Sequence, residues 1–160
     1  MAAQRGRLVA CLTAALLTCV NGCSSGVPAP PKLAASVPVS GTVTLDGKPL
    51  SDANVTFVPE TQAGFKGAIG RTDASGKYEL NTDIGAGKSS KGAIPGRYRV
   101  TVSRLVKPDG SALPPDFKEP PMNVGAMESI PLKYTSGTDS QLTYEVPAAG
   151  GTYDIQLTSK

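Results

Sequence analysis

The sequence predicts an all-β protein: a single seven-stranded Greek-key β-sandwich that follows a signal peptide and a tether. Three observations predict this class. Apolar and polar residues alternate in several short stretches, which is the period-two pattern of half-buried strands. The 18 glycines and 14 prolines recur between these stretches, as turn residues do between many strands. After the N-terminal segment, no stretch has the apolar spacing of an amphipathic helix.

The first 22 residues have the pattern of a signal peptide. Arg5 and Arg7 precede an apolar run, residues 8–20, that is too short to span a bilayer. Cys23 closes this segment, and residues 23–37 form a tether rich in proline, alanine and serine. The β-sandwich domain is therefore expected at residues 38–160.

The residues Val20-Asn21-Gly22-Cys23 resemble a bacterial lipobox, in which the chain is cut before a lipid-modified cysteine, although Asn21 departs from the usual small or apolar residue. The resemblance implies a diacylglyceryl thioether on Cys23. We expect more than one acyl chain, palmitate among them, because a single chain binds a membrane only weakly. The expected location is the bacterial cell envelope, at the outer membrane because Ser24 follows the cysteine. A secreted protein is the alternative.

Four stretches in the first half of the domain have the alternation or the β-branched and aromatic composition of strands: 39–45, 54–58, 68–72 and 77–81. Asp46-Gly47 is a strong tight-turn signal, and the second stretch is expected to return from it beside the first. The turn at residues 73–76 separates the third stretch from the fourth. Residues 83–92, rich in glycine, serine and lysine, are expected to form a mobile loop.

The second half begins with the clearest strand, residues 97–104, in which Tyr98, Val100 and Val102 share one face. Residues 107–129 contain five prolines and are expected to form a long irregular excursion, and such loops are often either functional or disordered. Two further strands, around residues 142–146 and 153–157, complete about seven strands, the number typical of a two-sheet sandwich.

Several motifs in this order resemble the carboxypeptidase regulatory-like, or transthyretin-like, β-sandwich domain. They are Val39-Ser40-Gly41-Thr42-Val43, Asp46-Gly47-Lys48-Pro49-Leu50, Ala53-Asn54-Val55-Thr56-Phe57, Thr72-Asp73-Ala74-Ser75-Gly76-Lys77-Tyr78, residues 95–102 and Lys133-Tyr134. The chain is also similar to small lipid-anchored proteins of planctomycete-type bacteria. Because the family's domain is a non-catalytic module, the resemblance implies a non-enzymatic structural or protein-interaction role and no catalytic residue.

Composition excludes several kinds of chemistry. The chain has no histidine, and its three cysteines end with Cys23, so the domain has no Ser-His-Asp triad and no usual zinc site. We expect no enzyme, no cofactor and no metal. Arg5 and Arg7 leave with the signal peptide, and the remaining 14 basic residues face 13 acidic ones, which gives no reason to expect nucleic acid binding. Residues 85–89 lack the glycine spacing of a phosphate loop, so no nucleotide is expected.

A second function remains open: an envelope protein that binds a carbohydrate or a peptide through the loop at residues 107–129. Phe117, Met122 and Met127 would be apolar contacts, together with Tyr134. An ordered loop beside a concave face would favour this function, and a mobile loop over a flat sheet would favour a structural or interaction module. Two minor alternatives are a sugar-stacking platform of tyrosines and a basic strip of Arg97, Arg99 and Arg104.

Intact mass measurement on protein from its native membrane fraction tests the processing signal. We expect a mature chain that begins at Cys23 and carries added diacylglyceryl mass, and we expect the Cys23→Ala variant to lose that mass because it lacks the acceptor thiol. A water-soluble chain without lipid, cut at another position, would instead identify a secreted protein.

Overall fold

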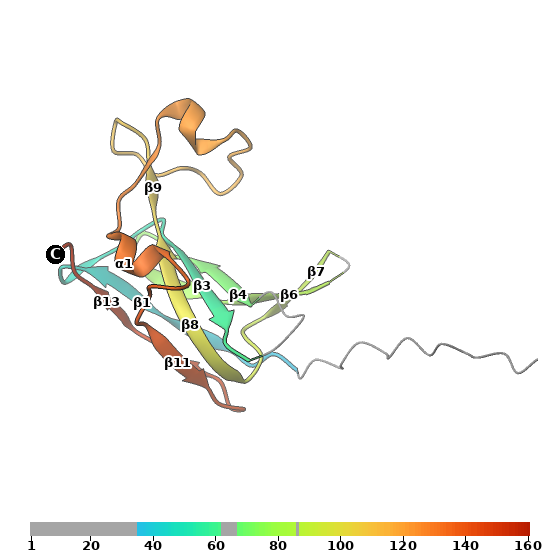
Figure 1. The fold of residues 1–160 in the computed structure, drawn as a ribbon. Coiled ribbons are helices and arrows are strands. Elements are labelled where there is room, and N and C mark those ends of the chain that lie inside the picture. The colour runs from blue at the N-terminus through green and yellow to red at the C-terminus, as the bar shows by residue number, and fades with distance from the viewer. Residues whose placement is uncertain (1–34, 62–66, 86) are drawn as a thin grey trace, which may run out of the picture. The chain divides into compact units, whose positions relative to one another are not determined.

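The computed structural model describes residues 35–61, 67–85 and 87–160 (Figure 1). The predicted signal peptide, Cys23 and most of the tether lie outside these residues. Within them the chain forms thirteen β-strands, a 3-10 helix η1 (Pro121–Val124) and a short helix α1 (Leu132–Thr135). The prediction of an all-β protein is confirmed.

The strands form two larger sheets and one small one. The six-stranded sheet has the order β11 (Thr143–Val146), β8 (Gly96–Ser103), β3 (Asn54–Pro59), β4 (Ala68–Arg71), β6 (Asn81–Gly85) and β7 (Lys88–Lys91). The five-stranded sheet is centred on β1 (Val39–Leu45), which pairs with β12 (Gly151–Thr152), β13 (Ile155–Leu157), β2 (Lys48–Pro49) and β5 (Lys77–Glu79). The small sheet pairs β9 (Leu105–Val106) with β10 (Met127–Glu128). These sheets differ in strand number from the predicted seven-stranded sandwich, whose Greek-key order stays a prediction.

The core lies between the two larger sheets and is built by strand alternation. Tyr98, Val100 and Val102 on β8 are fully buried, as the sequence predicts. Phe57 of β3 packs at its centre, and its ring centroid lies 5.7–6.5 Å from those of four tyrosines: Tyr78, Tyr98, Tyr144 and Tyr153. The rings of Tyr144 and Tyr153 lie 5.3 Å apart. These four tyrosines therefore pack with the core, and they do not form an exposed platform.

Two predictions about strand pairing are wrong. The strand at residues 54–58 does not return beside β1; β2 makes that turn, and β3 pairs with β4 and β8 in the other sheet. Residues 83–92 are not only a loop, because β6 and β7 form a hairpin there. The Oγ1 of Thr82 donates to the Gly92 carbonyl at 2.8 Å, so tertiary contacts supply the pairing that the composition does not predict.

The chain passes from one larger sheet to the other at Leu80, between β5 and β6. β5 pairs with β1 in one sheet, and β6 continues from it to pair with β4 in the other. The N–H of Leu80 donates to the Val39 carbonyl at 3.0 Å, while its own carbonyl accepts from the Gly92 N–H at 2.6 Å. Gly70 of β4 lies so close that an added Cβ would be 2.6 Å from the Glu79 carbonyl oxygen. The crossing therefore closes one side of the core.

Tyr153 and Asp154 interrupt the parallel pairing of β1 with β12 and β13. The Asp154 carboxylate accepts hydrogen bonds from the Thr42 N–H at 2.9 Å and its hydroxyl at 2.8 Å, replacing the ladder there. The Tyr78 hydroxyl donates to the Tyr153 carbonyl at 2.7 Å directly above Gly41. Glycine is required at position 41 because an added Cβ would lie 1.9 Å from that carbonyl oxygen.

Gly41→Ala is expected to lower the free energy of unfolding by at least about 2 kcal/mol, because β1 and the Tyr153 backbone must separate to admit the methyl group. Gly137→Ala is the matched control, since nothing lies within 4 Å of its added Cβ; its effect should stay within about 0.5 kcal/mol. Urea unfolding followed by tyrosine fluorescence measures both. Equal stabilities for the two variants would contradict the close approach at Gly41.

Candidate binding site

The excursion between β8 and α1 has a defined conformation at its base, where Glu128 is the central contact. Its Oε1 accepts from the N–H groups of Arg104 at 2.8 Å and Ile130 at 3.0 Å, and its Oε2 accepts from the Ser103 hydroxyl at 2.6 Å. β9 and β10 pair beside it, and Ala112 forms a further bridge with Val106. One carboxylate therefore fixes both the outgoing and the returning chain.

Arg71 ties the middle of the excursion to the six-stranded sheet. Its Nη2 donates to the Leu113 carbonyl at 2.6 Å and to Asp52 Oδ1 at 3.1 Å. Asp52 has a φ of 60° in the turn before β3, a conformation that aspartate tolerates better than most residues. That turn places the Asp52 carboxylate beside the Arg71 guanidinium. The guanidinium in turn holds the excursion over the outward face of β3 and β4.

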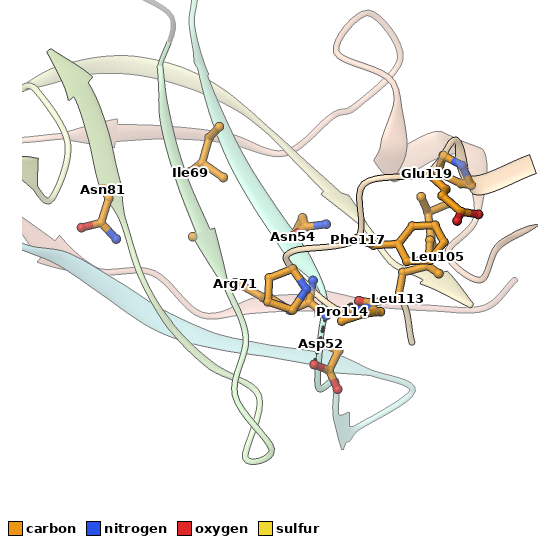
Figure 2. A pocket seen from close by; sticks show the side chains of 13 residues that line it. Asp52, Asn54, Ile69, Arg71, Asn81, Leu105, Leu113, Pro114, Phe117 and Glu119 are labelled. Carbon is orange, nitrogen blue, oxygen red and sulfur yellow. Dashed lines mark hydrogen bonds and ion pairs between the residues drawn. The ribbon is translucent and has the colours of Figure 1, made fainter. Parts of the chain in front are cut away.

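The excursion and the sheet enclose a pocket with a volume of about 390 Å³. Figure 2 shows Asn54, Ile69 and Asn81 along the strands, with Phe117, Glu119 and Leu105 on the side of the excursion. The remaining lining residues are Asp52, Gly70, Arg71, Leu113, Pro114, Pro115 and Pro121. The pocket is therefore concave and combines apolar surface with a few polar groups, which is the usual character of ligand sites.

The pairing of β3, β4 and β6 determines which side chains form the floor of the pocket. Thr56 pairs with Ile69, and Ile69 pairs with Asn81, so these three side chains form one row on the outward face. Ala68 and Gly70 point inward, where the core leaves room only for small residues. As a result, Ile69 is 56% exposed and is available for contact with a ligand.

The structure brings one of the predicted contact residues, Phe117, to this pocket. Met122 and Met127 are 82% and 67% exposed and are not among the lining residues. Tyr134 packs against the core, and its hydroxyl lies 3.2 Å from the Thr158 hydroxyl. Hydrogen bonding to Thr158 lowers the pKa of Tyr134. Of the four residues that were predicted as ligand contacts, the pocket thus contains one.

The strand side of the pocket was missed by sequence reasoning. Ile69 gives the one local signal, because a large apolar residue alternates there with Ala68 and Gly70 and must face outward if the small residues face the core. Asn54, Arg71 and Asn81 carry no such signal, since a polar residue on an outward strand face is ordinary.

The three arginines of the candidate basic strip make local contacts. Glu60 forms ion pairs with Arg97 at 3.0 Å and Arg99 at 3.2 Å. Arg104 Nε donates to the Ser51 carbonyl at 2.9 Å. These arginines therefore have intramolecular partners, which occupy part of their hydrogen-bonding capacity.

The predicted turn at residues 73–76 is held by the side chain of Asp73. Asp73 Oδ1 accepts from the N–H groups of Ser75 at 2.8 Å and Lys77 at 3.0 Å, and from the Ser75 hydroxyl at 2.7 Å. These hydrogen bonds, led by that of the Ser75 side chain, lower the pKa of Asp73. Across the described ranges, no group of three or more acidic, histidine or cysteine side chains is placed to hold a metal ion.

No family model, curated protein or solved structure matches this chain. In the described part of the chain, no helix has both the length and the hydropathy needed to cross a membrane.

Glu128→Ala is expected to lower the free energy of unfolding by about 2 kcal/mol, because two backbone N–H groups and one hydroxyl lose a charged acceptor. Hydrogen exchange of the amides between residues 104 and 130 should become faster. Glu119→Ala, on the same excursion but without a hydrogen bond among the described residues, should leave exchange unchanged. Equal protection in the two variants would show that Glu128 does not hold the excursion.

Proposed function

We propose that this protein is a non-enzymatic, lipid-anchored module of the bacterial cell envelope, located at the outer membrane, and that its pocket binds an extracytoplasmic ligand. The proposed fold is the seven-stranded Greek-key sandwich of the carboxypeptidase regulatory-like type, with the short additional strands as decorations of it. The signal-peptide pattern, the lipobox-like residues ending at Cys23 and the family resemblance support this proposal.

The observation that carries the binding function is the pocket of about 390 Å³ between the excursion and the sheet. An excursion held by Glu128 and Arg71 is an ordered loop beside a concave face, the arrangement that favours a binding protein over a purely structural module. A preformed pocket also binds more tightly than a loop that must be ordered by its ligand, because less conformational entropy is lost.

The lining supports a ligand with both apolar and hydrogen-bonding surface. Phe117 and Ile69 offer apolar contact, while Asn54 and Asn81 each offer amide donors and an acceptor. A carbohydrate or a peptide of the envelope has this character. A nucleic acid or a nucleotide is not proposed, because Arg71 is the lone basic side chain among the lining residues and already pairs with Asp52.

Ile69→Asp tests the pocket, with Ile84→Asp as its control. Both isoleucines lie exposed on the six-stranded sheet, at 56% and 47%, but only Ile69 lines the pocket. We expect Ile69→Asp to weaken binding at least about tenfold, because a carboxylate in this contact must be desolvated. Ile84→Asp should bind as the unmodified protein does.

The measurement is calorimetric titration with envelope saccharides and with peptides. A ligand that binds both variants equally does not occupy this pocket. If no saccharide and no peptide binds the unmodified protein, the proposed binding function is wrong, and a structural module remains.

A further inference from the structure

A second depression, with a volume of about 650 Å³, lies on the outward face of the five-stranded sheet. Its polar floor follows from the register, in which Ser40 pairs with Glu79 and with Thr152, and Thr42 pairs with Lys77. Because these residues alternate with Val39, Gly41 and Val43 along β1 and with Tyr78 on β5, their side chains face away from the core.

The two depressions are continuous, since Arg71 and Asn81 line both. They are continuous because the chain crosses from one sheet to the other at Leu80. Leu80 is buried, while Glu79 and Asn81 on either side of it are exposed and point outward. Glu79 therefore belongs to the floor of the second depression, and Asn81 lies at the junction of the two.

Several polar side chains in this combined groove have no hydrogen bond or ion pair within the described ranges: Asn54, Lys77, Glu79, Asn81 and Glu119. They include hydrogen-bond donors and acceptors in similar number. The lining as a whole has two basic residues, Arg71 and Lys77, against four acidic ones, Asp52, Asp73, Glu79 and Glu119. The groove is therefore polar and slightly acidic.

We infer that the two depressions form one groove that binds a linear, uncharged glycan chain. This inference rests on the proposed function and names its ligand class. Each sugar hydroxyl is both a donor and an acceptor, so a glycan can use neighbouring amide, ammonium and carboxylate groups together. Phe117 offers a ring face for the apolar side of a sugar at one end. Excess acidic residues disfavour an acidic polymer, and a groove that extends from one sheet to the other suits a chain.

A peptide fits the same surface less well. Peptides that bind sheets commonly add as a strand and use unpaired backbone groups at a sheet edge. The groove lies mainly over β1, β3 and β4, each of which is paired with strands on both sides, whereas β5 and β12 pair only with β1. Along most of the groove a peptide would have to rely on side chains, and few of its backbone groups would find partners.

Calorimetric titration of the mature full-length protein in detergent tests the inference, with neutral gluco-, manno- and xylo-oligosaccharides from the disaccharide to the hexasaccharide as probes. We expect affinity to rise with chain length for at least one series, because longer chains reach the second depression. The double variant Lys77→Ala/Glu79→Gln should weaken hexasaccharide binding about tenfold and leave disaccharide binding at the Phe117 end unchanged.

The matched control is Lys88→Ala/Glu145→Gln, which makes the same changes on exposed strand positions outside both depressions and should bind all probes normally. Affinity that does not depend on chain length, or a double variant with normal hexasaccharide binding, would overturn the inference. So would binding of peptides, or of charged glycans, without binding of any neutral series. In those cases, loss of binding in Ile69→Asp would still support the proposed binding function of the first pocket. If no probe binds the unmodified protein, both the proposed binding function and the glycan inference are wrong.

Discussion

The backbone of Leu80 is the contact on which the arrangement of the molecule depends, because it is hydrogen-bonded to both large sheets at once. Its N–H reaches Val39 in the five-stranded sheet, and its carbonyl accepts from Gly92, beside the hairpin of the six-stranded sheet. With no disulfide available after Cys23, the two sheets are held by such shared strands and by the core. The same crossing brings the outward faces of the two sheets together at Asn81, so it both links the sheets and makes the two depressions continuous.

The inward and outward faces of the sandwich therefore have separate roles. Inside, Phe57 and the tyrosines around it fill the space between the sheets, and burial raises the pKa of Tyr98 to about 12, so its hydroxyl stays protonated and donates to the Ile94 carbonyl. Outside, the side chains of Lys77 and Glu79 in the register pairs of β1 with β5 are exposed to solvent. Substitutions on the outward face can thus test the proposed binding while leaving the core intact.

Strands with clear alternation were predictable from the sequence, and contacts between distant segments were not. β8 has the expected bounds to within one residue, because its pattern is local. The hairpin at residues 81–91 has a loop-like composition and forms because Leu80 and Thr82 hydrogen-bond to Gly92. The pocket depends on Arg71 meeting the Leu113 carbonyl, 42 positions later, which no local pattern encodes. Phe117 was predicted as an apolar contact and lines the pocket, whereas Met122 and Met127, predicted on the same ground, do not line it.

The described chain enters the domain and begins the excursion at opposite ends of β8. The chain enters the domain where Val37 bridges Ala93, next to the start of β8, and the excursion begins where β8 ends (Figure 1). The eight residues of β8 separate these two ends by roughly 25 Å. The excursion side of the pocket therefore lies at the opposite end of β8 from Val37, while the second depression reaches Ser40, close to Val37. In the proposed lipid-anchored module, the Phe117 end of the groove is the end farther from the entry of the chain at Val37, because the eight residues of β8 lie between them.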